Sequence, residues 1–228
     1  MTRPWQTLAT VRTADGPLEL RQRGGSEFLI VIAGRVLMTS HATRSELAVA
    51  TLPAAQLAGR TAPRVLIGGL GMAYTLRAAL DVLPAGAELT VAELTPEVEG
   101  WCRGPLAVLT DGAVGDPRVR VVIDDVARVI ASAPRGHYDA IVLDLYEGPH
   151  AATQRADDAF YGRAALERSR AALAAGGVLA VWSEEPDEAF ARRFAAGGFA
   201  VGVHRLGATR THVVYLGHRE DRGREPKR

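Results

Sequence analysis

The sequence predicts an α/β fold in which a mostly parallel sheet follows a small antiparallel β region. Beyond Pro63, compact apolar runs alternate with stretches whose apolar residues recur at helical spacing, which is typical of βαβ units that cover both faces of a sheet. Before residue 40, short β-prone runs are separated by turn-forming residues, which is typical of β-hairpins. The two patterns together predict one main domain with a small N-terminal addition.

Size and composition narrow the class of protein. The 228 residues, 47% of them apolar, suffice for one substantial core. The formal net charge of +1 and the scattered basic residues disfavour nucleic acid as a partner. The sequence contains neither a signal peptide nor a run of about 18 apolar residues, so we expect a soluble protein without membrane contact. The single cysteine, Cys102, allows no internal disulfide and no thiolate metal site, and we therefore expect a cytoplasmic protein without a metal.

The N-terminal part contains four β-prone runs and one short helix. Apolar residues predict the helix over Ser45–Leu57, with an interruption at Pro53, because proline lacks the N–H that continues a helix. We assign residues 1–52 to this β region and its linking helix, residues 53–218 to the main domain, and residues 219–228 to a disordered charged tail. The predicted strands are Gln6–Arg12, Leu18–Arg23, Phe28–Ile32 and Arg35–Met38.

The main domain is predicted to contain five apolar strands separated by helices, followed by a hairpin. The hairpin is formed by the β-prone runs Phe199–Leu206 and Thr211–Leu216. The longest helix is predicted to end at Gly176 and Gly177, since glycine commonly stops helices. The predicted strands before the hairpin are Arg64–Ile67, Glu88–Ala92, Val119–Ile123, Ala140–Leu143 and Val178–Trp182, and the predicted helices are Met72–Leu83, Pro96–Leu109, Val126–Ala133, Ala156–Ala174 and Pro186–Ala195.

A glycine-rich turn follows the first strand of the main domain. Gly68, Gly69 and Gly71 lie between this strand and a helix, where a ligand can approach the backbone and the free N–H groups of the helix start. We predict that these glycines bind a cofactor, although an ordinary strand-to-helix turn has the same pattern. Tyr74 replaces the third glycine of the dinucleotide fingerprint, which disfavours NAD.

Acidic residues follow the next two strands. Glu93 lies about twenty residues beyond the glycine turn, where a carboxylate can accept hydrogen bonds from both hydroxyls of a ribose. Asp124 and Asp125 end the third strand, where a carboxylate can accept the exocyclic amino group of an adenine, and we favour Asp125 for this role. The two aspartates are alternatively caps of the following helix. The pattern thus favours a cofactor that contains adenosine.

The fourth strand ends at Asp144, and Glu147 follows in an acidic loop. Open α/β sheets bind ligands beyond the carboxyl ends of their strands, so we predict that Asp144 and Glu147 are the catalytic residues. An amine with a pKa of roughly 10 is a poor nucleophile while it is protonated, and a carboxylate can both bind it and accept its proton. The alternative is an acidic loop held by Arg155 or Arg163.

The order of these features resembles the spermidine synthase family of polyamine aminopropyltransferases. The resemblance implies a Rossmann-like, methyltransferase-type sheet with an antiparallel terminal hairpin. It also implies S-adenosylmethionine or decarboxylated S-adenosylmethionine as co-substrate, a small-molecule amine as acceptor, and a homodimer. The segments that carry the resemblance are Val65–Gly71, Glu93, Asp116–Val119 with Asp125, Tyr138–Asp144 and Phe160–Leu179.

Three departures from the family lie at places that recognise ligands. Leu70–Met72 contains no acid where the family holds the amino group of the cofactor. Glu147 replaces an aspartate of the catalytic loop, and Arg44–Glu46 replaces a Tyr-His-Glu motif. Our leading hypothesis is a transferase that alkylates an amine, as in polyamine biosynthesis. Methyl transfer from S-adenosylmethionine to a small acceptor and a non-catalytic binding relative are the alternatives.

Overall fold

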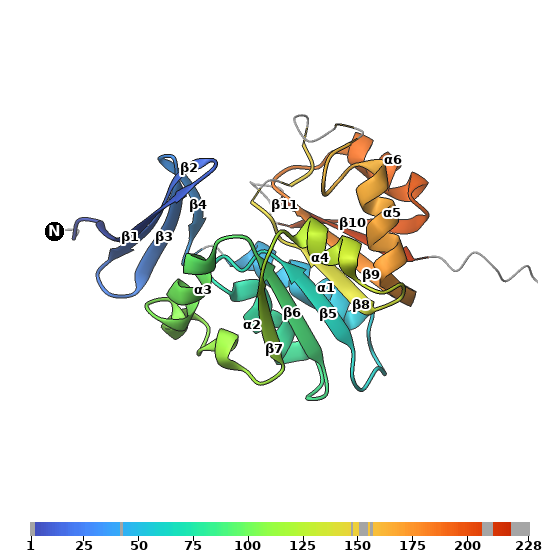
Figure 1. Cartoon of the computed structure of the whole chain (residues 1–228), viewed down its shortest axis with the longest axis horizontal. Helices are drawn as coiled ribbons and strands as arrows, with labels where there is room; N and C mark the ends of the chain where they lie inside the picture. The colour runs from blue at the N-terminus through green and yellow to red at the C-terminus, as the bar shows by residue number, and fades with distance from the viewer. Residues whose placement is uncertain are drawn as a thin grey trace, which may run out of the picture.

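The computed structural model describes residues 3–41, 43–146, 148–150, 155, 157–206 and 212–219. These residues form a four-stranded antiparallel sheet and a seven-stranded, mostly parallel sheet with helices around it (Figure 1). The predicted fold class, a main α/β sheet with a small N-terminal antiparallel region, is confirmed.

The four-stranded sheet is a meander of consecutive antiparallel strands. Alternate side chains of two neighbouring strands, Leu18 and Leu20 on one and Phe28 and Ile30 on the other, are buried, as expected for strands with one face against a core. All four belong to the same core as the main domain. The strands are β1 (Gln6–Thr13), β2 (Gly16–Arg23), β3 (Glu27–Ile32) and β4 (Arg35–Thr39).

Helix α1 (Arg44–Ala55) links the two sheets. The predicted interruption at Pro53 is wrong, because the helix continues through this residue. Pro53 lies in the last turn, where its missing N–H removes only one helical hydrogen bond. Val49 and Ala50 are buried in the main core, and their packing stabilises the helix despite the proline. The predicted boundary between residues 52 and 53 falls within this continuous helix.

The seven-stranded sheet is parallel over five strands and antiparallel at one edge. Across the sheet, the strands are β10 (Phe199–Leu206), β11 (His212–Arg219), β9 (Leu173–Ser183), β8 (Tyr138–Leu143), β5 (Arg64–Gly68), β6 (Glu88–Glu93) and β7 (Val119–Ile123). Neighbours from β9 to β7 pair in parallel, whereas β11 pairs antiparallel with both β9 and β10. The predicted antiparallel hairpin is confirmed, and β11 extends to Arg219, one residue into the predicted tail.

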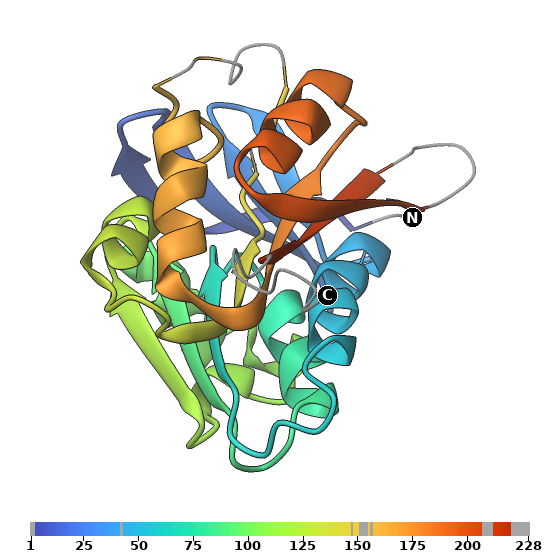
Figure 2. The same cartoon turned by 90° about the vertical axis from the view of Figure 1, so that its right-hand side faces the viewer.

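Helices cover both faces of the main sheet, as two views of the molecule show (Figures 1 and 2). Successive residues of β5 point to opposite faces, so that Ile67 packs into one core and Leu66 into the other. Helices α1, α2 (Tyr74–Val82) and α3 (Pro96–Arg103) contribute to the core that contains Ile67. Helices α4 (Val126–Ser132), α5 (Arg163–Ala172) and α6 (Glu188–Ala196) contribute to the core that contains Leu66.

The predicted helix Ala156–Ala174 begins later than expected, at Arg163. Its first part is a turn, because the side chain of Asp158 accepts hydrogen bonds from the backbone N–H groups of Phe160 and Tyr161. Aspartate competes for backbone hydrogen bonds in this way and so disfavours a helix. The apolar spacing of the sequence cannot reveal such a local bond.

The same helix also ends earlier than expected, at Ala172. Gly176 and Gly177 do not stop it, since both lie within β9, where the register against β8 shifts. Gly176 has a φ of +66°, which suits an irregularity within a strand. The predicted helix Pro96–Leu109 is also divided, into α3 and a 3₁₀ turn over Ala107–Leu109.

Candidate active site

The carboxyl ends of four neighbouring parallel strands, β8, β5, β6 and β7, meet at one edge of the main sheet. Backbone hydrogen bonds continue the sheet past the strand ends. The Asp144 N–H donates to the Gly68 carbonyl at 3.0 Å, the Gly69 N–H donates to a carbonyl of β6 at 2.9 Å, and the Asp124 N–H donates to the Glu93 carbonyl at 3.0 Å. The structure thus places these predicted site residues side by side along one rim.

The turn after β5 requires glycine for both conformation and space. Gly69 has a φ of +89°, and a Cβ at this position would lie 2.5 Å from the carbonyl oxygen of Asp144. A Cβ on Gly71 would lie 3.0 Å from the sulfur of Met38, and a Cβ on Gly68 would lie 2.8 Å from a side chain of α4. The turn therefore packs its backbone against the loop after β8, against α4 and against the N-terminal sheet.

Glu93 supports the glycine turn from β6. One of its carboxylate oxygens accepts a hydrogen bond from the Leu70 N–H at 2.9 Å, and the other accepts one from the Thr95 N–H at 2.8 Å. Its side chain is buried, which raises the pKa of Glu93 against the lowering effect of the backbone bonds. Each carboxylate oxygen retains acceptor capacity for a further bond. The predicted ribose contact stays a prediction.

Two apolar residues at this rim are missed by sequence reasoning. Leu94 directly follows Glu93 and is 68% exposed, while Ile123 ends the neighbouring strand and is 43% exposed. The two residues lie at the ends of neighbouring strands, where Ile123 is the register partner of Glu93. The signal in the sequence is the apolar residue that adjoins each acid at a strand end.

Asp124 and Asp125 organise the start of α4. Asp125 is the N-cap residue, and its side chain accepts a hydrogen bond from the Ala127 N–H at 2.8 Å. Asp124 accepts bonds from the Asp125 N–H at 2.7 Å and from the Arg128 side chain at 2.6 Å, and these bonds lower its pKa. The helix-cap interpretation is confirmed for Asp125. The adenine contact stays a prediction and is compatible with the cap.

Asp144 has the least ordinary electrostatic surroundings at the rim. Its carboxyl group accepts a hydrogen bond from the hydroxyl of Thr75 on α2. Burial raises the pKa of Asp144 to about 7, with the Thr75 bond opposing the rise and the negative charge of Glu46 adding to it. A carboxyl group with a pKa near neutrality can both accept and release a proton at physiological pH.

The charge of Glu46 acts on both Asp144 and Tyr74. Glu46 lies in the first turn of α1, where the Ser45 hydroxyl donates to its carboxylate at 2.8 Å. Tyr74 begins α2, and its hydroxyl donates to the Ser40 carbonyl at 3.0 Å. Burial and the charge of Glu46 raise the pKa of the Tyr74 phenol, so it remains protonated. In the sequence Glu46 is only the last residue of the segment that replaces the Tyr-His-Glu motif, and the tertiary structure brings its charge to Asp144.

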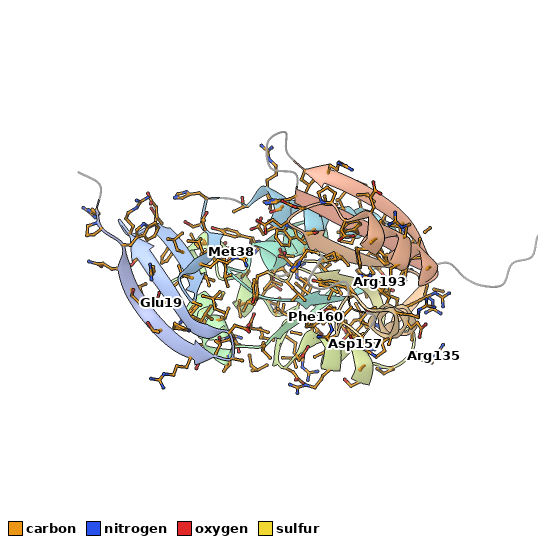
Figure 3. All side chains as sticks on the ribbon, turned by 90° about the horizontal axis from the view of Figure 1, so that it is seen from above. Glu19, Met38, Arg135, Asp157, Phe160 and Arg193 are labelled. Carbon is orange, nitrogen blue, oxygen red and sulfur yellow. The ribbon has the colours of Figure 1, made fainter. Side chains whose placement is uncertain are left out.

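Met38 brings the N-terminal sheet to the glycine turn. It lies on β4, where this sheet adjoins the rest of the molecule (Figure 3). Its sulfur lies 3.3 Å from the backbone N of Met72, which donates a hydrogen bond to it. The segment Leu70–Met72, where the resembled family has an acid, is therefore contacted by a neutral thioether.

Several other sequence predictions concern the surroundings of this rim. Glu147 lies outside the described residues, so its catalytic role stays a prediction. Arg155 pairs with Asp157. Cys102 is buried beneath the turn, and burial raises the pKa of its thiol to about 12.

In the ranges that the structure describes, no three His, Cys, Asp or Glu residues gather to hold a metal ion. The described helices are also too short or too polar to cross a bilayer.

Comparisons with known proteins connect this geometry to one class of structures. No family model matches the chain, and no curated protein matches it in sequence. Among solved structures, spermidine synthase from Thermotoga maritima aligns with a TM-score of 0.76 and 17% identity, over 94% of this chain and 73% of that chain. A spermidine synthase in complex with the transition state analogue AdoDATO aligns with a TM-score of 0.74 and 16% identity, over the same shares of the two chains.

A probable spermidine synthase from Corynebacterium glutamicum ATCC 13032 also aligns, with a TM-score of 0.65 and 21% identity, over 92% of this chain and 79% of that chain. Sequence identities this low establish similarity of fold. The chain thus has a methyltransferase-like α/β fold, and more particularly the fold of the spermidine synthases. The resemblance inferred from its motifs is confirmed at this level.

Proposed function

We propose that this chain is a spermidine synthase-like transferase that alkylates a small amine with S-adenosylmethionine or its decarboxylated form. One observation carries the proposal. A carboxyl group with a pKa of about 7, that of Asp144, lies on the same rim as Gly69, Glu93 and Asp125 and close to the charge of Glu46. A spermidine synthase of the same fold binds AdoDATO, which supports a co-substrate of this class.

In the proposed reaction, Glu93 and Asp125 hold the adenosine, and Asp144 lies beside the attacking nitrogen. Ionised Asp144 accepts a proton from the bound ammonium, and the lone pair of the resulting neutral amine forms a bond to a carbon attached to the sulfonium sulfur as the carbon–sulfur bond breaks. The nucleoside leaves as a neutral thioether, the alkylated nitrogen leaves as an ammonium, and Asp144 then releases its proton to solvent. The main contribution of the protein is to hold nitrogen, carbon and sulfur in line. Glu46 attracts the positive charge of the acceptor.

Methyl transfer is the second candidate, and one contact favours it. Both forms of the cofactor carry an ammonium, but S-adenosylmethionine carries a carboxylate on the same carbon, so only the decarboxylated form presents an uncompensated charge that needs a negative partner in a partly buried site. Near the glycine turn, the contact to Met72 comes from the thioether of Met38. A thioether is a weak acceptor for an ammonium. At this contact the uncompensated ammonium of the decarboxylated cofactor would find a neutral thioether, which favours S-adenosylmethionine and methyl transfer.

Product analysis tests the proposal directly. The protein is incubated with a series of small mono-amines and diamines and either nucleoside, and the products are identified by mass spectrometry. Aminopropyl transfer releases methylthioadenosine, whereas methyl transfer releases S-adenosylhomocysteine. We expect transfer with at least one nucleoside, and a loss of about 100-fold or more in Asp144→Asn, because this variant lacks the proton acceptor.

The control for this experiment is Asp81→Asn. Asp81 is an exposed aspartate that pairs with Arg77 near the end of α2 opposite Thr75, so its substitution makes the same chemical change at a solvent-exposed position. It should retain full activity. Tight binding of both nucleosides by calorimetry, without turnover of any acceptor, would instead identify a non-catalytic binding relative.

A further inference from the structure

Thr75 connects Asp144 to helix α1. It is the second residue of α2 and is only 3% exposed. Its hydroxyl donates to the Oδ2 atom of Asp144 at 2.5 Å, and the same hydroxyl oxygen lies 3.4 Å from the backbone carbonyl oxygen of Glu46. One hydroxyl group therefore has two acceptors on two different elements within its reach.

A hydroxyl group with these neighbours can serve both protonation states of Asp144. It has one proton to donate and two lone pairs to accept with. When Asp144 is ionised, the Thr75 proton points to Oδ2. When Asp144 is protonated, its own O–H donates to Oγ1 of Thr75, which turns its proton to the Glu46 carbonyl. In each state the two side chains then stay joined by a hydrogen bond, which matters because an unpaired polar group is costly in a buried place.

We propose that Thr75 is a positioning residue for proton transfer, which keeps the Asp144 carboxyl group in one orientation while it gains and loses its proton. The proposal rests on the proposed function, in which Asp144 accepts the proton of the amine. No covalent step involves Thr75 itself. Its hydroxyl only changes the direction of its proton as the charge of Asp144 changes.

The groups around Asp144 define what else influences its titration. Thr75 approaches from α2, the charge of Glu46 acts from α1, and the backbone of Gly69 packs against the Asp144 carbonyl. Among the described residues, Glu46 is the charged group that raises the pKa of Asp144, and the Thr75 bond lowers it. Removal of the hydroxyl should therefore raise the pKa of Asp144 further, since the ionised form loses its donor.

The test is Thr75→Val, which replaces the hydroxyl by a methyl group of similar size. The pKa of Asp144 is measured by carbon-13 NMR on protein labelled at the aspartate carboxyl groups, with Asp144→Asn to assign the signal. We expect the pKa to rise by about one unit in Thr75→Val. The pH at which the transferase activity is half-maximal should move upward by the same amount. Thr75→Ser should restore both values.

Thr51→Val is the matched control, because Thr51 also donates its hydroxyl to a backbone carbonyl but lies on the exposed side of α1. It should change neither value. An unchanged Asp144 pKa in Thr75→Val would overturn the proposal. If Thr75→Val does not fold, the Asp144 pKa is compared between Thr75→Ala and Thr75→Ser. Equal values in these two variants would overturn the proposal. Absence of turnover in the wild type would refute the proposed function, while the NMR titration would still decide the role of Thr75.

Discussion

The acids of the rim contribute to structure as well as to the proposed chemistry. Glu93 accepts two backbone hydrogen bonds and Asp125 caps α4, so both are held in fixed orientations before any ligand arrives. Asp144 differs from them in the size of its shift, because burial raises its pKa to about 7, close to neutrality. Ionisation of such a carboxyl group in the folded protein lowers the free energy of unfolding. Residues with strongly shifted pKa values are frequent at functional sites.

The raised pKa of Asp144 predicts that replacing this residue by asparagine increases the free energy of unfolding. The pKa of Asp144 is about 7 in the folded protein and near the ordinary value of 3.8 in the unfolded chain. The folded state therefore binds the proton more tightly than the unfolded chain does. Protonation of Asp144 thus stabilises the folded state fully below the unfolded pKa, and this stabilisation is lost as pH rises through about 7. Because Asp144 is only partly buried, we expect Asp144→Asn to unfold with a free energy about 1–2 kcal/mol higher than the wild type at about pH 8.

Urea unfolding at about pH 5 and about pH 8 measures this effect, and the gain should shrink at the lower pH as the wild-type carboxyl group becomes protonated. Asp81→Asn should show no such gain, since its carboxylate is exposed. A loss of stability in Asp144→Asn at the higher pH would contradict the raised pKa. Together with the loss of activity, a gain of stability would identify Asp144 as a residue kept for function.

At the scale of elements, the turn between β5 and α2 is where structure and proposed ligand binding depend on the same residues. Gly69 adopts a positive φ and packs against the backbone after β8, while Gly71 packs against the N-terminal sheet. In both contacts the turn contributes only backbone atoms, because glycine has no side chain. The position of the turn is therefore fixed by the elements around it.

Gly69→Ala should destabilise the protein by more than about 1 kcal/mol, because alanine disfavours the positive φ and its Cβ would collide with a carbonyl oxygen. Urea unfolding measures the loss, and calorimetry should show weaker nucleoside binding. Gly100→Ala is the matched control. Gly100 lies within α3 with open space around it, so alanine should stabilise the helix there by up to about 1 kcal/mol. Equal effects in the two variants would contradict the argument.

At the scale of the whole molecule, the N-terminal sheet belongs to the proposed site. Met38 of β4 contacts the glycine turn, and α1, which follows the sheet, places Glu46 near Asp144. The same core joins the small sheet to one face of the main sheet. The contacts at the rim thus depend on how the two sheets pack together.

Met38 offers a way to change cofactor preference from the N-terminal sheet. Met38→Glu places a carboxylate beside the glycine turn, where it can pair with the ammonium of decarboxylated S-adenosylmethionine, whereas it would repel the carboxylate that S-adenosylmethionine carries beside its ammonium. We expect its affinity for this cofactor, relative to S-adenosylmethionine, to rise about tenfold. Calorimetric titration with both nucleosides measures the ratio. Met38→Gln has a similar shape without the charge and should leave the ratio near its wild-type value, so an equal change in both variants would refute a charge effect.

The sequence by itself determined the order of strands and helices, the glycine turn and the acids at the strand ends. These features are local, since apolar spacing and glycine content report the conformation of short segments. Parallel strands then place their carboxyl ends at one edge, which is why Gly69, Glu93, Asp125 and Asp144 could be assigned to a common rim. Element ends were less predictable where a side chain bonds to the backbone, as Asp158 does.

Only the tertiary structure decided what surrounds the acid at the centre of the proposed chemistry. Thr75 and Asp144 are 69 residues apart in the chain, and Met38 and Met72 are 34 apart. The pKa of Asp144 depends on burial and on a neighbouring charge from α1, and neither is encoded in the strand that carries the residue. Contacts between distant segments follow from the packing of whole elements, which local sequence patterns do not specify.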